Sequence, residues 1–209
     1  MARPRSNIRF RIVHAAREQF LRSGVEATPL RTIARHAHTS IGMVYYYFPN
    51  KDDLFFEVVE EVYTALLSDL TQALTPDVPV RERIRRLYGR VGMASDIELS
   101  IVRLVFLEAL TSSSRLERLI KRFQRGHIPL VLAAIGDGIR DGSIDSRWSP
   151  ALAFISTLAL GGAAQMLRRI AGERLRVGDM PAGQALSDQL VDVLFDGIGR
   201  RPHTRRPVA

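Results

Sequence analysis

Three consecutive tyrosines occupy positions 45–47, in a segment that also contains Arg31, Arg35 and Lys51. A phenol offers a flat apolar face and a hydroxyl that can hydrogen-bond a phosphate or the edge of a base. Because successive residues of a helix are about 100° apart, three adjacent tyrosines cannot all face a core. At least one of them therefore points outward, near the basic side chains. The alternative interpretation is an aromatic core with one solvated tyrosine.

The first two elements that position this segment are predicted helices. Apolar residues recur at three- to four-residue steps over residues 8–20, and Gly24 follows as a left-handed cap residue should. A second, short helix is predicted over residues 30–37. Thr28 can cap this helix, and Pro29 suits its first turn.

The tyrosines lie on a third short helix, predicted over residues 41–47. Ser40 is a good cap for its start, and the helix ends before Pro49 because proline disfavours the helical conformation in the preceding residue. Asn50 caps a fourth, longer helix, and residues 52–53 place acids in its first turn, where the helix dipole favours them. Two short helices joined by about three residues, braced by a first helix and followed by a fourth, make a helix-turn-helix arrangement.

The rest of the chain also has a helical period, without a convincing alternating strand pattern. Thr75–Pro79 interrupts the apolar pattern after Leu74, and residues 142–145 and 178–181 are predicted to be turns. Further helices are predicted over residues 80–95, 97–112, 115–141, 149–171 and 183–199. The predicted fold class is all-α, with about nine helices: an N-terminal three-helix helix-turn-helix domain and a larger helical domain after it.

The net charge of +8 is unevenly distributed along the chain. Residues 1–51 contain nine Lys or Arg and two Asp or Glu, and the last ten residues contain four Arg and no acid. The stretch between them therefore carries a net charge of −3. The positive residues 1–51, called the head below, are thus followed by a mildly negative body. This distribution predicts a polyanionic partner for the head, bound in a salt-dependent way. The alternative is a charged, solvated surface.

The composition argues against several classes of protein. With no cysteine, neither a disulfide framework nor a thiolate metal site can form, and the histidines are too scattered to hold a metal, so no metal and no cofactor is expected. No Gly-x-Ser-x-Gly or comparable catalytic grouping is present, which argues against an enzyme. No apolar run approaches the roughly 18 residues of a membrane span, and the basic N-terminus lacks the apolar core of a signal peptide. We therefore expect a cytoplasmic protein without a membrane partner.

Residues 8–55, about a quarter of the chain, resemble the DNA-binding domain of the TetR family of transcriptional regulators. The three-helix spacing and the terminal aromatic motif both agree with the family. The matching residues are Ile33-Ala34, Ser40, Gly42, Val44-Tyr45-Tyr46-Tyr47-Phe48-Pro49-Asn50-Lys51 and Leu54. The resemblance implies a DNA-binding domain over residues 1–50 and a ligand-binding and dimerisation domain over residues 51–199. Residues 200–209 are predicted to be a disordered basic tail, because they lack an apolar stripe.

The resemblance also implies how the head would contact double-stranded DNA. Arg31 would reach a guanine edge or a phosphate, since bidentate Arg–guanine pairing is the commonest specific contact. Lys51 would hold a phosphate with the help of the fourth helix's N-terminus. Val44 and Phe48 would belong to the core of the head. The implied DNA contacts are Arg31, Thr32, Ser40, Ile41, Gly42, Met43, Tyr45, Tyr46, Tyr47 and Lys51.

Two departures from the family pattern alter this expectation. His38-Thr39 stands where the family often has Gly-Val, so the left-handed turn residue is not a glycine and is mildly strained. Ile41 stands where the family usually has a lysine or another polar residue. Together with Met43, it predicts van der Waals contact with thymine methyl groups rather than a hydrogen-bonded guanine.

A pair of glycines lies midway along the predicted helix 149–171, where small residues would let another helix approach closely. In the family, the last two long helices pack with those of the partner subunit into a four-helix bundle. The resemblance therefore implies a homodimer interface. The candidate interface residues are Gly161, Gly162, Leu190 and Leu194. The alternative is close packing within one subunit.

The resemblance further implies a ligand pocket enclosed by helices from roughly residue 55 to residue 141. Arg103 and Glu108 lie in an apolar stretch, either as polar anchors for a ligand or as an ordinary buried ion pair or surface charges. The low polarity of the candidate set favours a lipophilic small-molecule effector. The candidate ligand-binding residues are Tyr63, Tyr88, Met93, Arg103, Phe106, Leu107 and Phe123.

These features predict a TetR-like one-component regulator: a repressor that binds a pseudo-palindromic operator as a homodimer and is released by a small-molecule effector. Two rival functions stand beside this prediction. A non-specific or architectural DNA-binding protein would bind in a way that depends on salt alone. A helical enzyme or small-molecule carrier with an incidental basic head would keep its activity after truncation at about residue 50.

Overall fold

The computed structural model describes residues 5–171 and 181–197, and within these ranges the chain is helical, without strands. The chain forms two compact units. The first unit contains the residues up to Gln72 together with Ala94–Pro129, and the second contains Ala73–Met93 together with the residues from Leu130 onward. The prediction of an all-α fold is thus confirmed, whereas the proposed boundary after residue 50 stays a prediction.

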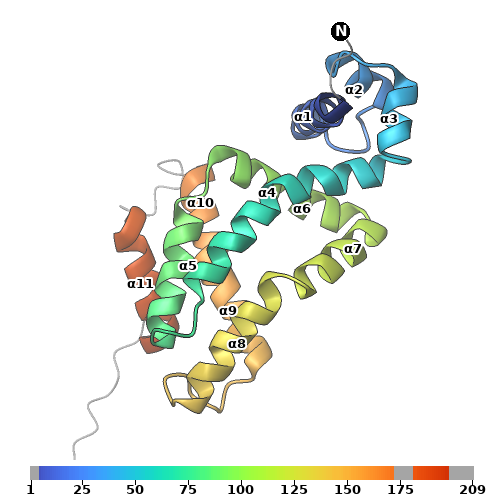
Figure 1. Cartoon of the computed structure of the whole chain (residues 1–209). Helices are drawn as coiled ribbons and strands as arrows, with labels where there is room; N and C mark the ends of the chain where they lie inside the picture. Colours follow the sequence, from blue (N-terminus) through green and yellow to red (C-terminus); the bar gives the residue numbers. More distant parts are fainter. Residues whose placement is uncertain (1–4, 172–180, 198–209) are drawn as a thin grey trace, which may run out of the picture. The chain divides into compact units, whose positions relative to one another are not determined.

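The first unit begins with four helices whose bounds agree closely with the predicted ones. They are α1 (Arg5–Ser23), α2 (Leu30–His36), α3 (Ile41–Tyr47) and α4 (Lys51–Ala73). Figure 1 shows α1, α2 and α3 gathered together, with α4 leading away from them. Their apolar faces meet in one core, whose fully buried members include Ile12, Phe20, Val25, Ile33, Val44, Leu54 and Phe55.

Three of the predicted caps are confirmed. Gly24 has a φ of +80°, the left-handed conformation that glycine adopts without a steric penalty. The hydroxyl of Ser40 accepts a hydrogen bond from the backbone N–H of Met43 at 3.2 Å. The side-chain oxygen of Asn50 accepts one from the N–H of Asp53 at 2.8 Å. The caps at Ser40 and Asn50 each satisfy a backbone donor that a helix start leaves without an intrahelical partner.

The predicted cap of α2 is wrong. Thr28 is buried, and its hydroxyl donates to the backbone oxygens of Gly24 at 2.7 Å and Gln19 at 3.2 Å. It therefore ties the turn back onto the end of α1 and is not available to the N–H groups of α2. Pro29 occupies the cap position itself and makes no side-chain hydrogen bond there.

The first unit is completed by α6 (Asp96–Thr111), α7 (Ser113–Gln124) and the first residues of α8 (His127–Arg140). The prediction of a single helix over residues 115–141 is wrong, because a turn at Arg125–Gly126 separates α7 from α8. Pro129 lacks a backbone N–H and would clash with a helix that continued from α7. Gly126 also packs tightly at the break: a Cβ atom there would lie 2.1 Å from the hydroxyl oxygen of Tyr63.

The second unit contains α5 (Val80–Gly92), most of α8, and the segment that follows Ser149. That segment comprises α9 (Pro150–Leu158), the π-helical turn η1 (Ala159–Ala163) and α10 (Ala164–Ala171), and α11 (Gly183–Asp196) comes last among the described helices. Figure 1 shows α5 beside α11 and the α9–α10 segment, and α5 packs on both α11 and η1. The predicted helix 149–171 is thus continuous but contains a π turn.

The predicted loop at Thr75–Pro79 and the turn at Gly142 are confirmed, and Gly142 has a φ of +79°. Three other predictions lie wholly or partly outside the described residues. They concern most of the turn 178–181, the last residues of the helix 183–199 and the basic tail 200–209.

The stretch Pro150–Arg169 is long and apolar enough, by length and composition, to cross a membrane, with a mean hydropathy of 1.4. The expectation that no apolar run approaches that length is therefore wrong here, because the polar residues between Pro150 and Leu167 are all uncharged. Only 17% of its apolar window is buried. A single such helix is a weak indication of a membrane protein, since a helix of a soluble protein can pass the same test.

Candidate nucleic-acid interface

Helix α3 divides its side chains between the core and the solvent. Val44 and Phe48 are buried, as predicted, and they orient the helix against the core of the head. Tyr45 is 53% exposed and Tyr46 is 72% exposed. Tyr47 is half-buried and meets the ring of Tyr46 edge-on, with 5.1 Å between the ring centroids. The prediction that at least one tyrosine points outward is confirmed.

The apolar residues at the start of α3 are only partly available to a partner. Ile41 is half-buried and packs against the core of the head, and Met43 is also half-buried. Gly42 is exposed, and a Cβ atom at that position would meet only the hydroxyl of Ser40, at 3.8 Å. The open space over Gly42 permits close approach of another backbone. The preference for thymine methyl groups stays a prediction.

The turn between α2 and α3 carries the expected strain. His38 has a φ of 49°, the left-handed conformation that L-residues rarely adopt. On α2, Arg31 and Arg35 are exposed and form no ion pair with any residue that the structure describes. Thr32 is half-buried, and its backbone oxygen is 2.8 Å from the ring nitrogen Nδ1 of His36. The two arginines therefore leave positive charge on the surface beside the turn.

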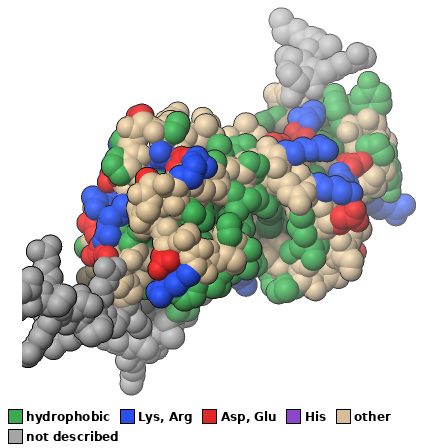
Figure 2. All heavy atoms as spheres, turned by 90° about the horizontal axis from the view of Figure 1, so that it is seen from below, with side chains coloured by type: hydrophobic (Ala, Val, Ile, Leu, Met, Phe, Trp, Pro, Cys, Tyr) green, Lys and Arg blue, Asp and Glu red, His purple; other side chains and the backbone are tan. Residues whose placement is uncertain are grey.

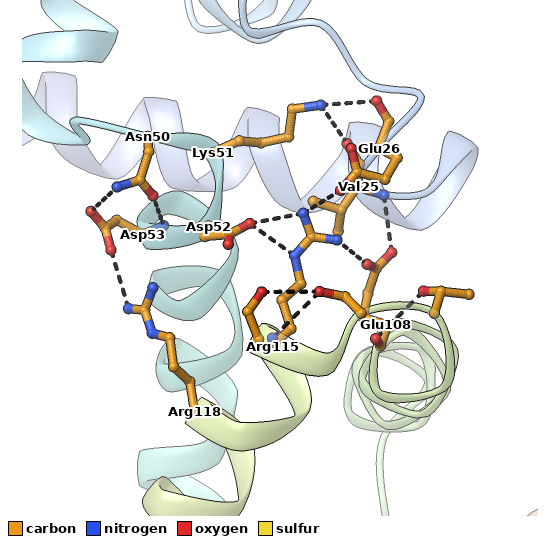
Figure 3. A network of polar contacts seen from close by, with 12 residues as sticks. Val25, Glu26, Asn50, Lys51, Asp52, Asp53, Glu108, Arg115 and Arg118 are labelled. Carbon is orange, nitrogen blue, oxygen red and sulfur yellow. Dashed lines mark hydrogen bonds and ion pairs between the residues drawn. The ribbon is translucent and has the colours of Figure 1, made fainter.

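Lys51, predicted to hold a phosphate, already has two acceptors within the chain. Its ammonium donates to the backbone oxygen of Val25 at 3.0 Å and to that of Glu26 at 2.8 Å (Figure 3). The lysine therefore fastens the α1–α2 turn to the first turn of α4. Its predicted contact with a phosphate stays a prediction, and its observed role is structural.

Arg115 forms the centre of a buried ion cluster that the sequence interpretation missed (Figure 3). The residue is only 5% exposed, yet its guanidinium contacts three carboxylates. Nε donates to Asp52 at 2.8 Å, Nη2 donates to Glu26 at 2.5 Å, and Nη1 donates to Glu108. The other oxygen of Glu108 accepts from the backbone N–H of Val25 at 3.3 Å. Four elements of the first unit thus meet at one side chain.

The charges in this cluster stabilise one another. Burial acts against the charged form of Arg115, but the hydrogen bonds to Asp52 and Glu26 outweigh it and raise the pKa of the guanidinium. Of the two interpretations of the charges on α6, the buried ion pair is correct for Glu108, whereas Arg103 is exposed. A signal was present in the sequence, because an acid in an apolar helix needs a partner, but its partners could not be identified.

Two further ion pairs hold α7 along α4. Arg118 contacts Asp53 at 3.1 Å, in a pair that is largely exposed. Arg122 donates two hydrogen bonds to Glu60, at 2.7 and 2.6 Å, and these bonds lower the pKa of that carboxyl. Together with Arg115, these arginines recur every three to four residues, so one face of α7 is clamped to α4.

The candidate ligand-binding residues are divided between the two units. In the first unit the rings of Tyr63 and Phe123 are in tilted contact, with 5.3 Å between their centroids, and the Tyr63 hydroxyl lies 2.9 Å from Nδ1 of His127. In the second unit Tyr88 is buried and donates to the backbone oxygen of Thr157 at 3.0 Å. The remaining candidates are exposed: Met93, Arg103, Phe106 and Leu107. Their role in ligand binding stays a prediction.

Gln165, in the second unit, is a polar residue that the sequence interpretation overlooked. It is 1% exposed, and neither atom of its amide has a hydrogen-bond partner among the described residues. Gly92 leaves room for it, since a Cβ atom there would lie 2.9 Å from the amide nitrogen. A buried amide without a partner is costly, so it is suited to a polar group that arrives from outside. The signal was a glutamine in a stretch, residues 150–167, that contains no charged residue.

The two glycines of the predicted dimer interface have different surroundings. Gly161 is buried against the ring of Tyr88, where a Cβ atom would lie 2.3 Å from a ring carbon. Gly162 has nothing within 4 Å of the same position. On α11, Leu190 is buried and Leu194 is half-buried. Gly161 and Leu190 are therefore explained by packing within the chain. Gly162 is not, since the space beside its Cα is open.

The α9–α10 segment exposes several large apolar side chains. They are Leu152, Ile155, Leu158 and Leu167, which are 45%, 61%, 37% and 48% exposed. An open groove of about 810 Å³ lies beside them, between the residues before α9 and the end of α11, and its lining includes Trp148, Leu152, Leu194 and Phe195. Figure 2 shows that apolar side chains also lie open to solvent on the face that it presents, among basic and acidic ones.

Comparison with known proteins agrees with this arrangement. Residues 12–58 match the family described as "Bacterial regulatory proteins, tetR family". An uncharacterised HTH-type transcriptional regulator of Bacillus subtilis, YhgD, is 29% identical over 139 residues, which cover 64% of this chain and 70% of the relative. The fatty acid metabolism regulator protein of the same organism is 24% identical over 135 residues, covering 64% and 69%.

The fold of nearly the whole chain is also shared with a solved regulator. The transcriptional regulator FadR from Bacillus subtilis, in complex with stearoyl-CoA, superimposes with a TM-score of 0.70 at 18% identity, over 91% of this chain and 99% of that one. The helix-turn-helix of α2 and α3, the matched domain and the shared all-helical fold lead to one conclusion. Residues 12–58 match the DNA-binding domain of the TetR family of transcriptional regulators, and the chain as a whole has the fold of such a regulator.

Proposed function

We propose that this regulator is a cytoplasmic, dimeric repressor that binds a pseudo-palindromic operator through α2 and α3 of each subunit and is released by an acyl-CoA. The observation that carries the DNA-binding part is the exposure of Tyr45 and Tyr46 on α3, beside the α2 arginines that form no ion pair with described residues. Guanidinium groups bind phosphates and guanine edges, and phenols add apolar contact and a hydroxyl. Half-sites would lie about one helical turn, roughly 34–36 Å, apart or somewhat more.

The exposed apolar side chains of the α9–α10 segment support the dimer. They are aliphatic and lie on one continuous helical segment, which in a single subunit leaves them in water at a cost of about 25 cal/mol per Å². A second copy of the chain offers the same surface across a two-fold axis, so each apolar side chain would gain an apolar neighbour. Gly162 would allow the two helices to approach closely.

An acyl-CoA effector is supported by two observations of different kinds. One relative is a fatty acid metabolism regulator, and the FadR structure holds stearoyl-CoA. In this chain, the amide of Gln165 is buried and lacks a hydrogen-bond partner among the described residues. Such a site suits a ligand that combines a long apolar chain with carbonyl or amide groups.

Selection from a random-sequence duplex library with the wild-type protein tests the operator part. We expect an enriched inverted repeat, bound at least about 10³-fold more tightly than a scrambled duplex at the same salt concentration. A uniform preference, with affinity that depends only on salt, would instead favour the non-specific DNA-binding alternative. Acyl-CoAs of increasing chain length are then added to the complex, with free coenzyme A and the free fatty acids as controls. Release by the acyl-CoAs alone is the expected result.

A further inference from the structure

We propose that Arg115 is the positioning residue of the DNA-binding head: it joins the α1–α2 turn and the first turn of α4 to the corner between α6 and α7, so that this corner sets the orientation of α3. The inference deepens the proposed function and rests on it, because it states how the head is held for an operator and how it is let go. Arg115 itself is buried and is not placed to contact DNA.

The elements that Arg115 connects belong to two groups. Glu26 follows α1, and Asp52 lies in the first turn of α4, so both belong to the helix-turn-helix framework. Glu108 lies near the end of α6, and Arg115 itself lies in the first turn of α7. Figure 3 shows the guanidinium between these groups, with a carboxylate on either side. Along the chain, the two groups are connected only through α4, α5 and most of α6, so the cluster links directly residues that are far apart in sequence.

The corner that holds Arg115 is tight. Ser112 is at once the C-terminal cap of α6 and the N-terminal cap of α7, and its hydroxyl accepts from the backbone N–H of Arg115 at 3.4 Å. A displacement of the end of α6 therefore displaces the start of α7 as well. Since the guanidinium is hydrogen-bonded to Glu26 and Asp52, the displacement reaches the turn that precedes α2 and the helix that follows α3.

Because the charges are buried, the cluster has two states, formed or opened, rather than a continuous range of positions. The side chain of Glu108 is 8% exposed, so its carboxylate cannot turn to water when Arg115 moves away. Loss of one partner of a buried pair leaves an uncompensated charge, which is strongly unfavourable. The cluster is therefore either formed, with the head fixed, or opened together with a rearrangement of α6. An effector that displaces α6 favours the open arrangement, and by reciprocity an operator that requires the fixed head weakens effector binding.

Arg118 provides a matched control one turn further along α7. It also pairs with an acid in the first turn of α4, but its side chain is 46% exposed and that of Asp53 is 36% exposed. Exposed pairs of this kind contribute little. A role in positioning predicts that Arg115 and Arg118 differ sharply, whereas a general contribution of α7 charges predicts that they behave alike.

The first experiment measures head orientation without DNA. The chain has no cysteine, so spin labels attach only at introduced ones: Arg35→Cys on α2 and Glu117→Cys on α7, diluted with unlabelled protein. We expect one narrow distance distribution in the otherwise unaltered protein and in Arg118→Gln. Arg115→Gln, and the double variant Glu108→Gln with Arg115→Gln, which leaves no buried charge at that pair, should give a broad one. Arg115→Lys keeps the charge but not the planar fork, and it should fold and give intermediate breadth.

The second experiment measures binding to the duplex that the wild-type protein selects. We expect an affinity loss of about tenfold or more in the double variant and a change within about twofold in Arg118→Gln, at equal folded fraction. A narrow distribution in the folded double variant and in Arg115→Lys, or wild-type affinity in the folded double variant, would overturn the positioning role. Failure of the wild type to select any sequence would refute the proposed function instead, and the distance measurement would still decide whether Arg115 holds the head.

Discussion

Helix α3 and the α9–α10 segment both leave large apolar surfaces in water, but the surfaces differ in chemistry. Tyr46 on α3 is 72% exposed, and Ile155 on α9 is 61% exposed. The exposed side chains of α3 are phenols, with a polar group at the tip and arginines on the neighbouring helix α2. Those of α9–α10 are aliphatic, on a stretch with no charged residue between Pro150 and Leu167.

This difference indicates two kinds of partner. A phenol remains hydrated at its hydroxyl and offers its ring to a base or sugar, so it suits a polar, anionic surface. An aliphatic side chain has no polar group to offer and gains only from an apolar partner. One exposed surface therefore suits DNA and the other suits a second copy of the chain. The four predictions that follow test this division, from the largest expected effect to the smallest.

The largest effect is expected at the two neighbouring glycines. Gly161→Leu places a side chain into the ring of Tyr88 and should lower the free energy of unfolding by roughly 2–4 kcal/mol. Gly162→Leu meets open space within the chain, so it should keep the fold and weaken only the dimer. Urea denaturation measures the first effect and sedimentation equilibrium the second. Equal stability of the two variants would contradict the packing of Gly161 on α5.

A charge on the aliphatic surface should dissociate the dimer. Ile155→Glu would bury a carboxylate between two apolar helices, at a cost of about 2–3 kcal/mol in association free energy. Gln189→Glu adds the same charge at an exposed position of α11 and serves as the control. The measurement is the dimer dissociation constant by sedimentation velocity over a range of protein concentrations. A dimer that survives in Ile155→Glu would move the interface away from this surface.

Removal of an exposed phenol should affect DNA binding and leave the fold intact. Tyr46→Ala is expected to weaken operator binding by roughly 1–3 kcal/mol with little change in melting temperature. Val44→Ala, two residues earlier on the same helix but fully buried, should instead lower the melting temperature. Fluorescence anisotropy and circular dichroism separate the two outcomes. Unchanged operator affinity in Tyr46→Ala would show that the proposed DNA-facing side of α3 is incorrect.

The smallest expected effect is the pH dependence of stability that the buried His127 contributes. Burial, aided by Arg122, lowers the pKa of His127 from 6.5, and its ring lies against Tyr63. Below about pH 6.5 His127 is protonated in the unfolded chain but stays neutral in the folded one. The free energy of unfolding should therefore fall as the pH decreases, by up to about 1 kcal/mol between pH 7.5 and 5.5. The urea midpoint of His127→Gln should show a smaller decrease over this range. A decrease of equal size in both proteins would assign the pH dependence to other groups.

The sequence alone determined the local architecture of the head. The left-handed Gly24 and His38, the caps at Ser40 and Asn50 and the outward tyrosines all follow from interactions within about four residues along the chain. Such interactions are visible in a sequence because both partners stand close together in it. The error at Thr28 has the same origin: a local rule predicted a cap, whereas its hydroxyl is bonded back to α1.

Only the tertiary structure decided which distant residues share a site. Arg115 lies 63 residues from Asp52 and 89 from Glu26, and no local rule joins them. In the same way, Gly161 and Gly162 are equivalent in the sequence, but the packing of Tyr88 makes one an interior residue and leaves the other open. Burial and charge pairing depend on which helix faces come into contact. That choice is made by the core as a whole, so it cannot be read from any single segment.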